Sequence, residues 1–104
     1  MSEKLLSALS MARGAGKLSI GYDASREAVE AGAPLAVLAA DASPRTAAGV
    51  RAFCEGRCPL ALLEETQDDI AAKFGRRFAV AAVTDGNFAV LVRKNLDIPQ
   101  EERE

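Results

Sequence analysis

The residues best suited to catalysis or metal binding are two cysteines, Cys54 and Cys58. Four positions apart on a helix, they would share one face, a spacing that suits metal or redox use. A structural zinc site, however, needs four ligands, mostly Cys or His, and the chain has two cysteines and no histidine. We therefore interpret both residues as reduced, buried thiols, and we expect no metal and no cofactor.

The lack of histidine also removes the commonest general acid or base and the usual partner of a nucleophilic serine or cysteine. An acidic patch, Glu64, Glu65, Asp68 and Asp69, could hold a divalent cation. Acidic residues around a helix start are more often solvated charges that favour the helix dipole. No base, nucleophile and oxyanion site can be assembled from the sequence, which therefore predicts a protein that is not an enzyme.

The charge of the chain is unevenly distributed. The formal net charge is -2, and residues 97–104 contain four acidic side chains against Arg103 alone. Residues 1–96 therefore hold 12 basic and 11 acidic side chains, close to +1. Such a balance neither demands nor forbids an RNA partner, and only the clustering of the cations can decide.

The length of 104 residues corresponds to one compact domain, and 49% hydrophobic residues suffice for a core. We predict a single domain over residues 1–96 and a flexible acidic tail over 97–104. The longest apolar runs, 35–40 and 78–83, are far shorter than the roughly 18 residues of a membrane span. Without a basic and apolar leader at the start, we expect a cytoplasmic protein, and a monomer.

Helical and strand patterns alternate along the chain. Four predicted helices each begin at a capping side chain and end near a glycine. Their caps and ends are Ser2 and Gly14, Asp23 and Gly32, Ser43 and Gly56, and Thr66 and Gly75. Apolar segments at 17–20, 35–40, 59–63 and 78–83 are predicted strands. Residues 87–95 are ambiguous, because Asp85-Gly86 between apolar runs is a strong hairpin signal. The alternation predicts an α/β sandwich with a sheet of about four strands.

Three stretches, 11–23 (MARGAGKLSIGYD), 37–46 (VLAADASPRT) and 82–89 (AVTDGNFA), together resemble the ribosomal protein L-seven-Ae / L-thirty-e family, in particular its small bacterial members. The resemblance covers nearly all of residues 3–95. It implies a three-layer α/β/α sandwich around a mixed four-stranded sheet. It also implies a helix after Asp85, which we adopt in place of the hairpin.

The same resemblance implies RNA binding, typically to the kink-turn, and no catalysis. Relatives carry a Gly-x-Asn-Glu-x-x-Lys motif that aligns with residues 21–27 here, where Gly21 matches. Asp23 keeps an acceptor but lacks the amide donors, Ala24 has no side-chain hydrogen bond to offer, and Glu27 reverses the charge of the lysine. The kink-turn readout is therefore not transferred unchanged.

The resemblance brings a set of cations to one end of the sheet, as a candidate phosphate clamp. These are Lys17, Arg26, Arg76 and Arg77. In the family the loop before the last strand also contacts RNA, so the resemblance implies an RNA contact for Arg76, Arg77 and Phe78 here. Tyr22 could stack on a base or pack over its own helix. The predicted partner is a structured RNA, ribosomal or containing a kink-turn, with no DNA and no membrane. The alternative is a protein-interaction module that keeps the fold but has lost kink-turn recognition.

Overall fold

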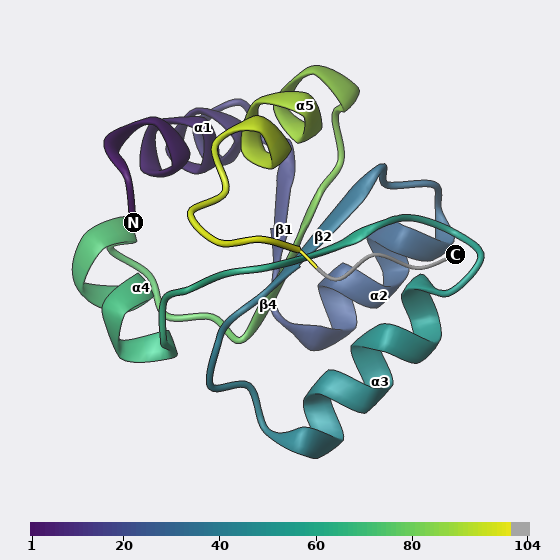
Figure 1. Ribbon diagram of the computed structural model, residues 1–104. Coiled ribbons are helices and arrows are strands. Elements are labelled where there is room, and N and C mark those ends of the chain that lie inside the picture. Colours follow the sequence, from purple (N-terminus) through teal and green to yellow (C-terminus); the bar gives the residue numbers. More distant parts are fainter. Residues whose placement is uncertain (101–104) are drawn as a thin grey trace.

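A computed structural model describes residues 1–100, which contain five helices and four strands (Figure 1). Helices and strands alternate along the whole of this range, as the sequence predicts. The elements are α1 (Glu3–Gly14), β1 (Leu18–Ile20), α2 (Tyr22–Glu30), β2 (Leu35–Leu38), α3 (Pro44–Cys54), β3 (Leu60–Leu62), α4 (Gln67–Phe74), β4 (Val80–Val83) and α5 (Gly86–Lys94).

The four strands form one mixed sheet in the order β1-β4-β2-β3. Strand β4 is antiparallel to both of its neighbours, with Leu18 opposite Val83 on β1 and Leu38 opposite Val80 on β2. Strands β2 and β3 run parallel. The start of β4 therefore lies at the same end of the sheet as the last residues of β1, β2 and β3.

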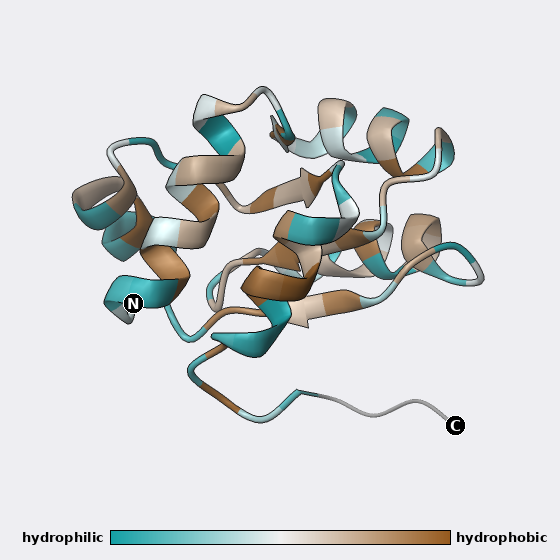
Figure 2. Ribbon diagram, turned by 90° about the horizontal axis from the view of Figure 1, so that it is seen from above, coloured by the Kyte–Doolittle hydropathy of each residue, from teal (hydrophilic) through white to brown (hydrophobic). Residues whose placement is uncertain are grey.

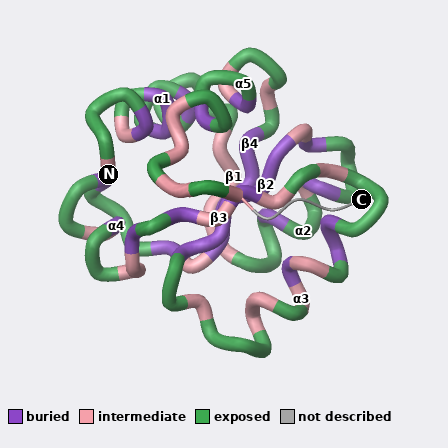
Figure 3. Tube along the Cα trace, in the orientation of Figure 1, coloured by how far each residue is buried: buried purple, intermediate pink, exposed green. Residues whose placement is uncertain are grey.

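Two helical layers cover the two faces of the sheet, which confirms the predicted α/β/α sandwich (Figure 1). Because side chains alternate along a strand, Leu35 and Val37 face one layer and Ala36 and Leu38 face the other. Strands β2 and β4 are consequently buried throughout (Figure 3). In hydropathy colouring the helices alternate between teal and brown along their length, while the strands are tan to brown (Figure 2).

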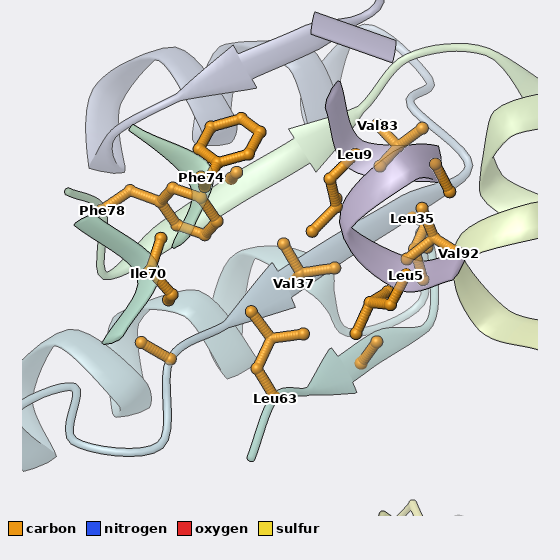
Figure 4. Packing of buried hydrophobic residues seen from close by; sticks show 14 of the residues in the cluster. Leu5, Leu9, Leu35, Val37, Leu63, Ile70, Phe74, Phe78, Val83 and Val92 are labelled. Atoms are coloured by element: carbon orange, nitrogen blue, oxygen red, sulfur yellow. The ribbon is translucent and has the colours of Figure 1, made fainter. Parts of the chain in front are cut away.

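The larger core lies between the sheet and the layer made of α1, α4 and α5 (Figure 4). Leu5 and Leu9 of α1 and Ile70 of α4 are fully buried there. Burying a side chain of this size contributes about 1.5–3 kcal/mol. The opposite core is built by α2 and α3, with Val29, Val50 and Phe53 against the sheet.

Side-chain caps define three helix starts as predicted from the sequence. The Ser2 Oγ accepts a hydrogen bond from the Leu5 N–H at 3.1 Å, and the Ser43 Oγ accepts one from Thr46 at 3.1 Å. Thr66 and Asp69 form a reciprocal capping box. The helix that follows closes at Gly75, whose φ of 84° is the left-handed conformation that glycine adopts at helix ends.

Residues 86–94 form helix α5, so the helix implied by the resemblance is confirmed and the hairpin signal is wrong. The Asp85 carboxylate accepts hydrogen bonds from the backbone N–H groups of Asn87 at 3.0 Å and Phe88 at 3.1 Å. An Asp-Gly pair suits a tight turn, but here the aspartate is an N-cap. Ala89 and Val92, three positions apart, then bury one face of the helix.

The segment after α5 returns across the molecule to the outer strand. The Gln100 side-chain amide donates to the Leu62 carbonyl at 3.0 Å and accepts from the Leu62 N–H. Nearer to α5, the Asp97 carboxylate accepts from the Ser2 N–H at 3.2 Å. The flexible tail predicted for 97–104 stays a prediction, and residues 101–104 of it lie outside the described residues. Every helix within residues 1–100 is too short or too polar to span a lipid bilayer.

Candidate nucleic-acid interface

The start of α2, the turn after β2 and the loop before β4 meet at one end of the sheet, which we call the α2 end. The Gly21 N–H donates to the Val80 carbonyl at 3.0 Å, and the Ala39 N–H donates to the Ala79 carbonyl at 2.8 Å. These two hydrogen bonds continue the pairing of β4 with β1 and with β2 past the ends of the strands. The antiparallel pairing of β4 with β1 and β2 is therefore what brings residues 21–26, 39–46 and 76–79 together.

Helix α2 starts earlier than the sequence indicates. The prediction that Asp23 caps it is wrong, because Gly21 is the N-cap and Asp23 lies within the first turn. Gly21 has φ 101°, a conformation that other residues rarely adopt. It carries no side-chain acceptor, and no side-chain cap is formed within the described residues. The first N–H groups of α2 are thus left to solvent or a ligand, where the helix dipole favours an anion.

Tyr22 packs across α3 rather than projecting from α2. Its ring lies edge-on to Phe53, with ring centroids 5.5 Å apart. The ring also covers Gly49, where an added β-carbon would lie 2.2 Å from the Tyr22 hydroxyl oxygen. The side chain remains 37% exposed. Tyr22 is therefore part of the outer core between α2 and α3, with one edge reachable from the α2 end.

The charged residues of α2 are all solvent-exposed. Arg26 lies 3.8 Å from the Asp23 carboxylate, with side chains 45% and 85% exposed. An exposed pair at such a distance contributes about 0–1 kcal/mol, so a phosphate can replace Asp23 at low cost. Glu27 follows on the same exposed side of the helix, one turn after Asp23, and adds a second negative charge.

The loop before β4 supplies two arginines and a buried aromatic ring. Arg77 forms an exposed ion pair with Asp68. Arg76 is exposed and pairs with no other described residue. The structure corrects the expectation for Phe78, because its ring is 4% exposed and packs edge-on against Phe74 at 5.7 Å, inside the larger core (Figure 4). Phe78 therefore fixes the loop in place and does not offer a stacking surface.

Lys17 lies at the opposite end of the sheet, so the prediction that it joins the clamp is wrong. Its carbonyl accepts a hydrogen bond from the Thr84 N–H at 2.9 Å, beyond the last residue of β4. Since β1 is antiparallel to β4, the start of β1 faces away from Arg76 and Arg77. The direction of β1 thus removes Lys17 from the cations of the α2 end.

Arg45 is a cation of the α2 end that the sequence interpretation passed over. It lies in the first turn of α3, directly after Ser43 and Pro44, and its side chain is exposed. The sequence contained the information needed to place Arg45. A helix that starts just after a central strand must begin at the end of the sheet where that strand stops, and α3 follows β2 in this way. The Asp41 carboxylate in the same turn accepts from the Gln67 N–H at 2.8 Å and so joins the turn to α4.

The acidic residues that could hold a cation are mostly engaged elsewhere. Asp69 belongs to the capping box, and Asp68 pairs with Arg77. The buried Glu65 carboxylate forms an ion pair with the amino terminus of Met1 at 2.7 Å. Carboxylate oxygens of Glu64, Glu65 and Asp97 lie within 4.8 Å of one another, and the ammonium pairs with Glu65 among them.

A shallow groove lies outside the α2 end, between α1 and α5. Its volume is about 380 Å³, and its floor is apolar, with Ala8, Met11 and Leu91 between the side chains of Lys4 and Lys94. Met11 is 54% exposed and Leu91 39%. The groove shares no residue with the cations of the α2 end.

Comparison with solved structures reveals the same fold in other proteins. A protein of unknown function from Bacillus halodurans superposes with a TM-score of 0.77 at 24% identity, over 88% of this chain and 99% of that one. The 15.5kD RNA-binding protein of Giardia lamblia superposes with a TM-score of 0.70 at 18% identity, over 90% of this chain and 86% of that one. No model of a protein family matches the sequence, and no curated protein does.

Proposed function

We propose that this chain binds structured RNA through the α2 end and performs no catalysis. The observation that carries the proposal is the meeting of the uncapped α2 start with Arg26, Arg45, Arg76 and Arg77 at one end of the sheet. The shared fold with an RNA-binding protein supports the same conclusion. The proposed setting is the cytoplasm, with the protein acting as a monomer on a ribosomal or kink-turn-like RNA.

The cations supply contacts to phosphates. Arg76 is available without breaking another interaction, and Arg77 can exchange Asp68 for a phosphate because the pair is exposed. The first N–H groups of α2 offer a further anion site beside them. Contacts of this kind position a backbone without reading its sequence.

The acidic groups on α2 limit what can be read from the bases. Asp23 and Glu27 accept hydrogen bonds and do not donate them when ionised, so both disfavour acceptor atoms on base edges. Tyr22 adds one partly exposed ring, whose hydroxyl end lies over Gly49 of α3. The proposed recognition is therefore of a bent RNA shape, with most contacts to phosphates and with Gly21 allowing close approach of the backbone.

The experiment uses two RNAs: a kink-turn, and the same RNA with its sheared G·A pairs replaced by Watson–Crick pairs. Binding of the purified protein is measured at low and physiological salt. Tight binding to the first RNA alone would support recognition of the kink. Weak, equal and salt-sensitive binding to both RNAs would mean that the protein contacts only the RNA phosphates and does not recognise the kink. No binding to either RNA would contradict the proposal.

The groove between α1 and α5 favours a second candidate, a protein-interaction module. Met11 and Leu91, which line the groove together, are 54% and 39% exposed, and adjoining apolar side chains of this kind suit contact with a partner protein. A stoichiometric protein partner that survives nuclease treatment and is lost on Met11→Asp would support this candidate. Partners recovered only through RNA would contradict it.

A further inference from the structure

Cys54 and Cys58 lie at the two ends of one tight turn. Cys54 is the last residue of α3, and the Cys58 N–H donates to its carbonyl at 3.1 Å. Gly56, between them, has φ +72°, which lets the chain reverse over so few residues. The turn places the two side chains next to each other at the edge of the core between α2, α3 and the sheet.

This geometry is compatible with a bond between the two sulfur atoms. A disulfide requires Cα atoms about 4.4–6.8 Å apart. The backbone hydrogen bond holds positions 54 and 58 together across the turn. Closing the disulfide then requires the two β-carbons to lie about 3.5–4.5 Å apart. Each thiol shifts the pKa of the other, which places the two side chains close together across the turn.

The two thiols have unequal environments. Cys54 is 3% exposed, while Cys58 is half-buried and can be reached from solvent. The interaction with the Cys54 thiol lowers the pKa of Cys58. The same interaction, with burial, raises the pKa of Cys54. Cys58 is therefore the reactive sulfur and Cys54 the protected one.

We propose that Cys54 and Cys58 form a redox-active thiol pair that closes to an internal disulfide by exchange with a low-molecular-weight disulfide. In the first step the Cys58 thiolate attacks one sulfur of that disulfide, forming a mixed disulfide and releasing one small thiolate. In the second step Cys54 loses its proton to solvent and attacks the Cys58 sulfur, releasing the second small thiolate. The two protein thiols are oxidised, and one small disulfide is reduced to two thiols.

The second step becomes accessible because of the first. While Cys58 is a thiolate, its charge and its hydrogen bond both hold the proton on Cys54. Once Cys58 is bonded to the small thiol, its sulfur carries no charge and accepts only weakly. Burial then remains as the one cause that raises the pKa of Cys54. The Cys54 thiol therefore ionises more readily in the mixed disulfide, the state in which it has to attack.

In the test, the reduced, folded protein is incubated with glutathione disulfide, and the remaining thiols are blocked with an alkylating agent. Mass spectrometry then gives the mass of the intact chain. The expected product is lighter than the reduced chain by two hydrogen atoms, carries no glutathione and takes up no alkylating agent. Trypsin cleavage after Arg57 separates residues 52–57 from 58–73. The proposal expects these two peptides to remain linked until a reductant is added, a readout that needs no variant.

Two variants distinguish the roles of the sulfurs. Cys54→Ser is expected to stop at the glutathione adduct on Cys58, and Cys58→Ser to react at least about tenfold more slowly than the parent. Circular dichroism establishes that each variant folds. A parent chain that keeps a stable glutathione adduct, links only to a second chain or stays fully reduced would overturn the proposal. Equal reaction rates for Cys58→Ser and the parent would overturn it as well.

Discussion

Gly49 leaves the space that the Tyr22 ring occupies. A β-carbon at position 49 would lie 2.2 Å from the Tyr22 hydroxyl oxygen and 3.0 Å from the ring carbon that bears it. The ring can therefore reach across α3 and form its T-shaped contact with Phe53 only because the helix has no side chain at this position. The orientation of Tyr22 at the α2 end is thus set by a residue in the middle of another helix.

Gly49→Ala is expected to displace Tyr22 while changing the free energy of unfolding by less than about 1 kcal/mol. The alanine gains about 1 kcal/mol of helix propensity, and the lost aromatic pair costs about as much. Tyr22 is the only tyrosine and the chain has no tryptophan, so its fluorescence reports the movement directly. Acrylamide should quench the variant more strongly. Gly14→Ala, where an added β-carbon meets nothing within 4 Å, is the control and should leave the fluorescence unchanged.

Replacing Arg76 and Arg77 together by alanine is expected to weaken RNA binding and to lower the slope of log K against log salt by about 2. Lys17→Ala is the matched control, because Lys17 is exposed and basic but lies at the other end of the sheet. Binding titrations at several salt concentrations measure both. Equal losses from the arginine pair and from Lys17 would remove the α2 end as the contact surface.

Phe78→Leu is expected to lower the free energy of unfolding by about 1–2 kcal/mol, because it removes a buried ring that packs on Phe74. The RNA affinity of the folded variant should stay within about twofold of the parent, since the ring does not reach the surface. Urea unfolding and RNA titration on the same sample measure the two effects. A large loss of affinity in a fully folded variant would restore Phe78 to the RNA contact surface.

Asp85→Ala is expected to destabilise the fold by about 1 kcal/mol, because the carboxylate caps two N–H groups at the start of α5. Asp85→Ser keeps a capping oxygen and should recover most of the loss. Urea midpoints of the three proteins measure the effect. A hairpin would give similar losses for both variants, since alanine and serine would both replace a favoured turn residue.

The capping box of α4 makes stability depend on acid pH. The backbone N–H and hydroxyl of Thr66 both hydrogen-bond the Asp69 carboxylate and lower its pKa below the ordinary 3.8. A carboxyl group with a lowered folded pKa stabilises the fold above its unfolded pKa, and this contribution is lost as the pH falls through the folded value. Asp69→Ala should therefore be less stable than the parent at neutral pH, and the difference should shrink below pH 3.8. Urea midpoints across this range provide the measurement, with Asp68→Ala as the control.

Local signals in the sequence were sufficient for most of the fold. Serine or threonine before an apolar periodic run predicted the starts of α1, α3 and α4, because a side-chain cap is a property of a few adjacent residues. The two-faced apolar runs of β2 and β4 predicted central strands covered on both sides.

The errors concern features that adjacent residues do not determine. Asp23 has the type of an N-cap, but Gly21 takes that place because of its backbone conformation and its bond to Val80. Lys17 was predicted at the wrong end of the sheet, because the direction of β1 within the sheet decides at which end its first residue lies. Phe78 was predicted to contact RNA because the end of the loop and the start of β4 cannot be told apart in an apolar run.

The outer strand β3 would otherwise present unpaired backbone groups along one side of the sheet. At Leu62 the side-chain amide of Gln100 takes both the N–H and the carbonyl, as a neighbouring strand would. An amide side chain imitates the peptide group but cannot continue the ladder, so the row of hydrogen bonds stops with it. The chain thereby closes part of its own edge to strand exchange with other molecules, a protection against aggregation supplied by a single glutamine.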